Sequence, residues 1–255
     1  MKIRCKMPRI GTRKLYFLLQ EDLRIMHIKI GRDVLFNFLR AENLLVKPKR
    51  SYVKTTNSRH WMRKYPNLIK GMEINRPEQL WVSDITYIKT AKGHEYLSLI
   101  TDAYSKKIMG YALLDTLSTA GPLEALSFAL KSRKYNTELI HHSDRGLQYC
   151  STDYIEMLKK NNIKISMTEN GDPYENAIAE RINGILKYEF SIIDGFNDHL
   201  QAIKVIDESI RIYNENRPHL SCQMLTPNKM HMQQRVKLKK WNKKTSKVFH
   251  SEVTI

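Results

Sequence analysis

Two acidic residues in the middle of the chain have neighbours that suit metal-ion chemistry. Asp144 follows a short apolar run with two histidines and precedes a turn at Gly146, so we expect its carboxylate at the end of a strand. Glu180 lies in a stretch where Ile178 and Ile182 recur at helical spacing. The chain between the two carboxylates is long enough for a helix, a strand and a loop, which could bring them together.

A third carboxylate is available upstream. Residues 80–88 read LWVSDITYI, a run of β-forming residues with Asp84 in its middle. A carboxylate inside a strand is costly unless it is paired or bound to a cation, and Mg²⁺ favours oxygen ligands. Three converging carboxylates could hold two such ions for phosphoryl transfer. Asp102, at the end of the next expected strand, competes with Asp84, but its place before a turn favours a turn-capping role.

The helix around Glu180 has a readable beginning. Asp172 suits an N-cap, Pro173 suits the first helical position, and Glu175 has capping-box spacing. Residues three, four and seven positions apart share one face of a helix, so Lys187 lies on the face of Glu180. Its ammonium group could reach a terminal phosphate; a solvated surface lysine is the alternative.

Other residues near these carboxylates have weaker functional interpretations. Arg181 lies one step off the Glu180 face, and we expect a secondary contact with DNA. His142 could also approach DNA, although a hydrogen-bonded structural histidine is the commoner case. Residues 169–172 (ENGD) are expected to form a mobile loop over the site, with acids that serve as turn and cap residues.

Three motifs together carry a family resemblance. W-x-x-D-I-T-Y, H-S-D-x-G-x-Q-Y and N-A-x-x-E-x-x-N-x-x-x-K-x-E resemble the DDE catalytic core of bacterial insertion-sequence transposases. They are most similar to the integrase-like product of the second reading frame in copy-out, paste-in elements. The resemblance runs from about residue 11 to about residue 232. One departure is Glu175, where relatives often have Asp; both residues fit a capping position.

The resemblance implies a mechanism, cofactors and partners. Asp84, Asp144 and Glu180 would hold two Mg²⁺ ions, for which Mn²⁺ may substitute. The chain would cut DNA at element ends, and the freed 3′-hydroxyl would attack another phosphodiester. A homo-multimer would bridge two ends, and the upstream-frame helix-turn-helix protein, or its fusion to this chain, would be a partner. A bacterial cytoplasmic, nucleoid-associated protein is implied.

The order of expected elements indicates an α/β core. Three strands joined by short turns come first, and helices and strands then alternate. The expected strands are 80–90, 94–103, 106–115, 138–143 and 163–167, and the expected helices are 119–133, 151–160, the Glu180 helix and 198–216. The resemblance names this arrangement a ribonuclease-H-like core, a mixed five-stranded sheet with flanking helices.

Positive charge is concentrated at the two ends of the chain. The net charge of +17 divides into +14 for residues 1–76, −3 for residues 77–234 and +6 for residues 235–255. Basic arms suit phosphate backbones, and an acidic middle suits a metal site. A generally basic, solvated surface is the alternative.

The N-terminal part is expected to be a small helical unit. Residues 11–45 contain two short helices, with Arg32 and Arg40 beside the apolar face of the second. They form either a helix-turn-helix-like, DNA-binding pair or a hairpin that only packs on the core. The following stretch contains Lys49 and Arg50 and is either a linker that follows DNA or a solvated tether.

These observations give a domain plan. It consists of a helix-turn-helix-like segment (1–46), a basic linker (47–76), an integrase-type catalytic core with its C-terminal helix (77–232) and a basic tail (233–255).

Cysteine usage and hydropathy indicate the compartment in which the protein is expected. Cys5, Cys150 and Cys222 are few and far apart, which argues against a disulfide framework and for a reducing compartment. With only one cysteine before residue 150, an N-terminal zinc module is not expected. We see neither a membrane-spanning run nor a signal peptide, so we expect no membrane partner.

Three functions remain open at this level. A transposase would cut DNA and join it, a nuclease of the same fold would cut without joining, and a non-catalytic regulator of transposition would bind DNA through its basic arms alone. The presence of all three carboxylates and of Lys187 speaks against a decayed, non-catalytic site.

Overall fold

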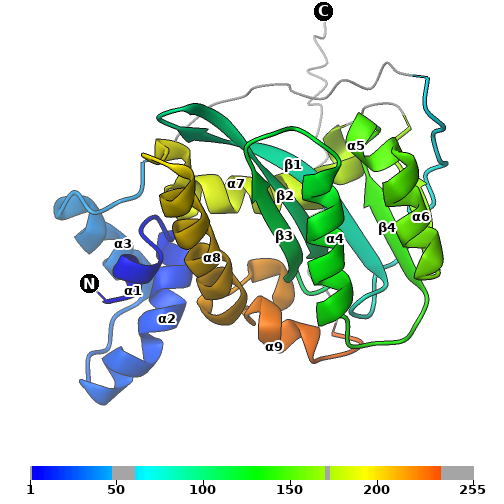
Figure 1. Cartoon of the computed structure of the whole chain (residues 1–255). Helices are drawn as coiled ribbons and strands as arrows, with labels where there is room; N and C mark the ends of the chain where they lie inside the picture. Colours follow the sequence, from blue (N-terminus) through cyan, green and yellow to red (C-terminus); the bar gives the residue numbers. More distant parts are fainter. Residues whose placement is uncertain (1, 48–60, 170–172, 237–255) are drawn as a thin grey trace, which may run out of the picture.

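A mixed five-stranded sheet forms the centre of the molecule (Figure 1). The computed structural model describes residues 2–47, 61–169 and 173–236. Strands β1 (Leu80–Thr90), β2 (Gly93–Asp102) and β3 (Ile108–Leu114) are antiparallel, whereas β4 (Leu139–Ser143) and β5 (Ile163–Met167) run parallel to β1. The spatial order is β3-β2-β1-β4-β5. The five strands predicted from the sequence are confirmed, with ends that differ by at most two residues.

Alternation along the antiparallel strands gives the sheet two apolar faces. On β2, Leu97 and Leu99 belong to one buried cluster and Ile100 belongs to another on the opposite face. Strands β4 and β5 are almost wholly buried, as expected for parallel strands covered on both sides. The sheet therefore needs a layer of helices on each face.

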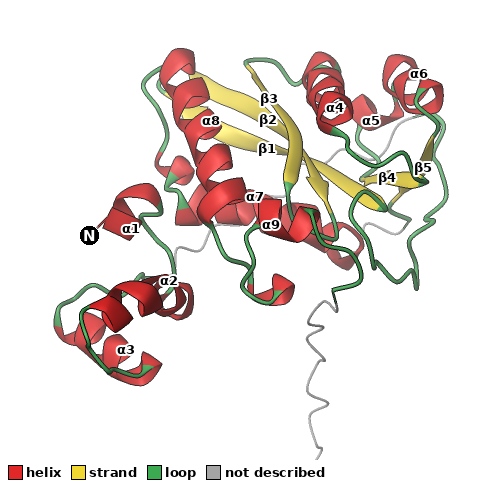
Figure 2. Cartoon of the chain, turned by 90° about the horizontal axis from the view of Figure 1, so that it is seen from below, coloured by secondary structure: helices red, strands yellow, loops and turns green. Residues whose placement is uncertain are grey.

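Helices supply both layers (Figure 2). Helices α4 (Ala120–Ser132), α5 (Leu147–Cys150) and α6 (Thr152–Lys160) pack on the face that contains Ile100, and α7 (Ala177–Glu189) and α8 (His199–Asn216) pack on the other. The short α9 (Pro227–His231) follows, and short 3-10 helices comprise residues 173–176, 192–194 and 220–222. No helix within the described ranges is long and apolar enough to cross a membrane.

The beginning of α7 differs from the sequence-based expectation. The α-helix begins at Ala177 after a 3-10 turn, not at Pro173, and its N-cap Asn176 makes no side-chain capping bond. The predicted cap Asp172 lies outside the described residues. Glu175 accepts hydrogen bonds from the Glu169 amide (2.8 Å) and the Asn67 side chain (3.3 Å). Tertiary contacts of this carboxylate therefore replace part of the expected local capping.

The N-terminal segment packs on the α8 side of the molecule. Helices α1 (Lys2–Lys6) and α2 (Thr12–Ile25) lie on that side (Figure 1), and α3 (Arg32–Ala41) packs against α2. Leu15, Leu35 and Leu39 are buried in the same cluster as the apolar side chains of α7 and α8. The apolar face expected for α3 is only partly buried, because Val34 and Phe38 are each 57% exposed.

The second half of the expected linker is part of the folded core. The Leu68 amide donates to Ser166 Oγ (2.9 Å), and the Pro66 carbonyl accepts from the Met167 amide (3.3 Å). Ile69, Met72 and other apolar residues of this stretch pack against Leu80 and Val82. The tether interpretation is therefore wrong for these residues, while Lys49 and Arg50 lie outside the described ranges.

Strand β3 and helix α4 approach each other closely at Gly110. A Cβ at this position would lie 2.0 Å from the Ala125 carbonyl oxygen and 2.6 Å from the Ala129 amide nitrogen. Backbone atoms cannot yield as the end of a side chain can, so a larger residue must push α4 away from the sheet.

We predict that Gly110→Ala lowers the free energy of unfolding by about 3 kcal/mol through overpacking. The control is Gly184→Ala, because a Cβ on that helical glycine meets nothing within 4 Å. It should stabilise the protein by ~0.5–1 kcal/mol through helix propensity. Urea unfolding of both variants measures the difference, and equal midpoints would contradict the proposed close contact.

Candidate active site

Asp84 and Asp144 meet at the junction of β1 and β4. The parallel register pairs Leu80 with Ile140 and Val82 with His142. Asp84 lies two residues after Val82 on β1, and Asp144 lies two residues after His142, directly after the end of β4, so both come to the same edge of the sheet. Side chains at matched positions of paired strands share one face of a sheet. The two carboxylates are therefore neighbours because of strand pairing, although they are far apart in the sequence.

The Asp84 carboxylate is held on both oxygens. Oδ2 accepts a hydrogen bond from Asn183 Nδ2 (2.7 Å), and Oδ1 accepts one from the Ile85 amide (2.9 Å). Burial, the Asp144 charge and, to a smaller extent, the Glu180 charge together raise the pKa of Asp84 to about 7, against the two hydrogen bonds, which lower it. A carboxyl group in such surroundings gains from a nearby cation.

Asp144 is oriented by the turn that follows it. Its Oδ1 accepts a hydrogen bond from the Gly146 amide (3.0 Å), and a Cβ on that glycine would stand 3.1 Å from the same oxygen. Tyr149 is buried beside the pair, and its pKa is raised far above the usual value by burial, by Tyr154 and by both aspartates. Among the described residues, its hydroxyl has no hydrogen-bond partner. The sequence analysis gave Tyr149 no role; its place in the Asp144 motif was the available signal.

Helix α7 presents one polar face toward Asp84. Asn183, one turn after Glu180, makes the hydrogen bond to Asp84, so it ties the helix to β1. Glu180 is exposed, and burial of part of its carboxyl group raises its pKa. Lys187 is half-buried; desolvation lowers its pKa and the Asp84 charge opposes that shift. The face predicted from helical spacing thus borders the carboxylate pair, whereas Arg181 is exposed beside it.

The carboxylates suit a hard divalent cation only in part. Magnesium takes oxygen ligands, often one or two carboxylates together with water and phosphate oxygens, and the pair Asp84–Asp144 fits that description. In the part of the chain that the structure describes, no three His, Cys, Asp or Glu side chains form a group that could hold a metal ion. The three-carboxylate ligand set expected from the sequence therefore stays a prediction. Burial and the charges of Asp144 and Glu180 raise the pKa of Asp84, so the three carboxylates lie within electrostatic reach of one another.

Both histidines before Asp144 are buried. His141 Nε2 lies 2.7 Å from Ser83 Oγ and 2.9 Å from Tyr154 Oη, and His142 Nδ1 lies 2.8 Å from Ser166 Oγ. Burial lowers the pKa of His141 to about 3 and that of His142 to about 4, so both are neutral near pH 7. A direct contact of His142 with DNA, left open by the sequence, does not agree with an exposure of 0%.

Asp102 has the turn-capping role favoured over a ligand role. Its Oδ1 accepts hydrogen bonds from the Ser105 amide (2.7 Å) and hydroxyl (2.6 Å), and its Oδ2 accepts one from the Glu78 amide (2.7 Å). The hydrogen-bonding capacity of this buried carboxylate is thus used by its own turn and a neighbouring segment.

Two other expected DNA contacts, Arg32 and Arg40, lie in the N-terminal segment. Arg32 and Arg40 are exposed on α3; Arg32 pairs with Asp33 (2.8 Å), and the Arg40 guanidinium lies 4.7 Å from the centre of the Phe36 ring. Both remain accessible to a phosphate backbone. Residues 170–172 of the expected loop lie outside the described ranges.

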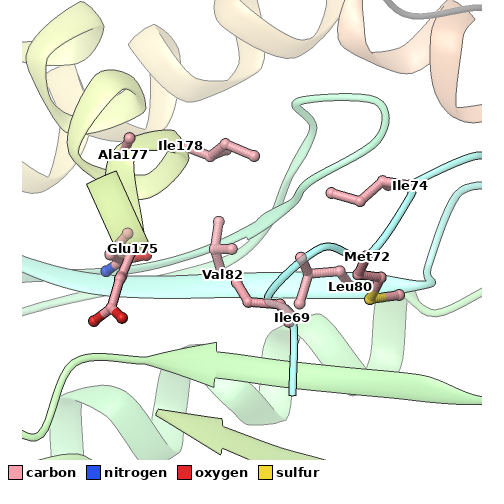
Figure 3. A pocket seen from close by; sticks show the side chains of 9 residues that line it. Ile69, Met72, Ile74, Leu80, Val82, Glu175, Ala177 and Ile178 are labelled. Carbon is pink, nitrogen blue, oxygen red and sulfur yellow. The ribbon is translucent and has the colours of Figure 1, made fainter. Parts of the chain in front are cut away.

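A small pocket borders the 3-10 turn before α7 (Figure 3). Its volume is about 120 Å³, and apolar side chains from β1, from the preceding segment and from α7 line most of it. Asn176 donates to the Ser83 carbonyl (3.0 Å) at its edge. Because the lining is mainly apolar, this pocket does not suit an anionic group such as a phosphate.

Comparisons with known proteins define the class. Two models, both described as an integrase core domain, match residues 74–173 and 161–227. The fold resembles that of an integrase in a simian T-cell lymphotropic virus intasome, with a TM-score of 0.56 and 18% identity over 92% of this chain and 79% of that chain. It also resembles the HTLV-2 integrase catalytic core domain, with a TM-score of 0.50 and 19% identity over 62% of this chain and 98% of that chain. The ribonuclease-H-like fold of the retroviral integrases is thereby confirmed.

Sequence relatives define the family within that class. The 31 kDa protein of insertion element IS600 from Shigella sonnei is 38% identical, over 89% of this chain and 85% of its own length. Transposase InsF of IS3fB from Escherichia coli K12 is 30% identical, over 84% of this chain and 75% of its own length. The chain belongs to the insertion-sequence transposases with an integrase core, which act in DNA transposition and integration by transferring polynucleotide strands.

The raised pKa of Asp84 predicts how stability changes with pH. Between about pH 4, the usual pKa of an aspartate, and about pH 7, the folded chain retains a proton that the unfolded chain has lost, so stability falls as pH rises. Asp84→Asn removes this titration and keeps an oxygen for Asn183. In a chelator, its melting temperature relative to wild type should rise between pH 5 and pH 8. A constant difference would show that Asp84 ionises normally.

Proposed function

We propose that the chain catalyses metal-dependent cleavage and joining of DNA, with Asp84, Asp144 and Glu180 as metal ligands. The observation that carries this proposal is the electrostatic coupling of Asp84 to both other carboxylates, at a site bordered by a helix with Lys187. Two Mg²⁺ ions, or Mn²⁺ in their place, would supply charge neutralisation and activation of the attacking and leaving oxygens when bound.

The chain's own residues have separate tasks in this scheme. Asp84 and Asp144 present oxygen ligands from adjacent strands, and Asn183 fixes the Asp84 oxygen that faces α7. Glu180, which is exposed in the first turn of α7, would supply the third carboxylate of the ligand set. Lys187 offers its ammonium group to a phosphate, and its partial burial strengthens that attraction.

The reaction consists of two phosphoryl transfers. In cleavage, water attacks the phosphorus at an element end, the P–O3′ bond breaks, and the leaving 3′ oxygen takes up a proton. In joining, that 3′-hydroxyl loses its proton and attacks a target phosphorus, the P–O3′ bond of the target breaks, and the leaving 3′ oxygen takes up a proton. Both steps are isoenergetic or downhill exchanges of one phosphoester bond and require positioning and charge neutralisation.

The proposed partners follow from charge and family. DNA ends and target DNA would lie along the basic N-terminal segment, including Arg32 and Arg40, and along the stretches with Lys49 and Arg50. Arg181 would contribute from the edge of the site. We also propose a homo-multimer that bridges two ends, cooperation with an upstream-frame helix-turn-helix protein or fusion, and action at the nucleoid in the bacterial cytoplasm.

We predict that Asp144→Asn abolishes cleavage and joining, with a loss of at least about 10³-fold, because it removes a metal ligand. DNA retention should stay within twofold of wild type in a filter-binding assay. Asp153→Asn is the matched control, because Asp153 is an exposed carboxylate in the first turn of α6. Wild-type activity in Asp144→Asn would refute the assignment.

An assay with pre-cut element ends distinguishes a transposase from the two alternative functions. A transposase joins such ends to a target in Mg²⁺, a nuclease of the same fold cuts uncut DNA but leaves pre-cut ends unjoined, and a non-catalytic regulator does neither while binding DNA.

A further inference from the structure

Glu189, the last residue of α7, joins three distant parts of the chain. Its carboxylate accepts two hydrogen bonds from the Arg217 guanidinium, with Nε–Oε2 at 2.8 Å and Nη2–Oε1 at 2.7 Å. Lys14 Nζ of α2 lies 3.0 Å from Oε1. The backbone carbonyl of Glu189 accepts from the Arg9 amide (3.0 Å). One residue thus connects the catalytic helix, the N-terminal segment and the chain after α8.

Arg217 has little freedom to pair with anything else. The residue is 1% exposed, and its guanidinium lies 5.7 Å from the centre of the Tyr213 ring. Its Nη1 lies 2.8 Å from His219 Nε2. Burial and the Arg217 charge lower the pKa of His219 well below its usual range, so this imidazole is neutral and accepts. A guanidinium buried in this way needs the Glu189 carboxylate, and the planar two-bond geometry fixes where Glu189 stands.

The position of Glu189 sets the orientation of the catalytic helix. Glu180 and Glu189 stand at opposite ends of α7, about 13 Å apart at the rise of an α-helix. The N-terminal end of this helix has no side-chain cap. The polar contacts that hold α7 include the hydrogen bond from its N-cap Asn176 to the Ser83 carbonyl, the Asn183–Asp84 bond and the ion pair at its C-terminal end. A small tilt at Glu189 moves both Glu180 and Lys187 relative to Asp84.

We propose that Glu189 and Arg217 are positioning residues for the candidate active site. Their ion pair anchors the C-terminal end of α7 and so places Glu180 and Lys187 beside the aspartate pair. Lys14 extends this anchor to α2, which makes the N-terminal segment a structural support of the site. The catalytic consequence rests on the function proposed above; the anchor itself lies outside the carboxylate cluster.

Arg217→Lys tests the anchor, because lysine keeps the charge but cannot make two parallel hydrogen bonds to one carboxylate. In the full chain, we expect kcat for joining pre-cut ends to fall at least tenfold, since displacements near 1 Å can cost about 10²-fold. The Mg²⁺ concentration for half-maximal rate should rise at least threefold, while DNA affinity stays within twofold. A loss of folded protein would lower activity without changing that Mg²⁺ dependence.

A second readout does not depend on activity. Calorimetric titration with Mn²⁺ in the absence of DNA should show at least threefold weaker binding by Arg217→Lys. Glu208→Gln is the control, because Glu208 makes an Arg ion pair on neighbouring α8 that is exposed on both sides. It should match wild type in kcat, Mg²⁺ dependence and Mn²⁺ affinity.

Lys14→Gln tests the proposed anchor if Arg217→Lys does not fold. It removes the outer cation and leaves the Arg217–Glu189 pair intact, so we expect smaller changes in the same direction, about threefold in kcat. A folded variant with wild-type kcat, Mg²⁺ dependence and Mn²⁺ affinity would overturn the anchor. If wild type itself joins no DNA, the proposed function fails, and the Mn²⁺ titration still tests the anchor.

Discussion

The candidate site depends on two like charges that the sheet holds side by side. Parallel pairing of β1 with β4 ends at Val82 and His142, so Asp84 on β1 and Asp144 directly after β4 come to the same edge of the sheet. Burial and the neighbouring charge raise the pKa of Asp84 to about 7. The fold thus keeps an electrostatically unfavourable pair, which a proton or a divalent cation relieves. Repulsion between neighbouring carboxylates is common in metal-binding sites, because the positive charge of a bound cation balances it.

Helix α7 adds two charged side chains, Glu180 and Lys187, beside this pair of carboxylates. Asn183 ties the helix to Asp84, while Glu180 and Lys187 stand on the same face at opposite ends of the site. The apolar side of α7 packs against the sheet, α8 and the N-terminal helices. The N-terminal segment is therefore an integral part of this fold, since it shares a core and the Glu189 ion cluster with α7.

The strands and most helices were predictable because their signals are local. Alternating apolar residues and short turns marked β1, β2 and β3 within two residues, and Asp198 caps α8 through the Gln201 amide where the apolar period begins. The predictions failed where partners distant in the sequence decide the outcome. Glu175 takes part in tertiary hydrogen bonds near the start of α7, and residues 62–76 are held by Ser166 and the sheet instead of forming a tether. Val34 and Phe38 satisfy helical periodicity but face outward.

The sequence by itself determined the order of elements, the family and which acidic residues stand at strand ends or on a helix face. Periodicity, turn residues and motif spacing are short-range properties, so they can be recognised in the sequence alone. Only the tertiary structure decided that Asp84 and Asp144 come to the same edge of the sheet, that His142 is buried, and that Glu189 meets both Arg217 and Lys14. These outcomes depend on strand register and on contacts between segments far apart in the chain, and no local pattern encodes either.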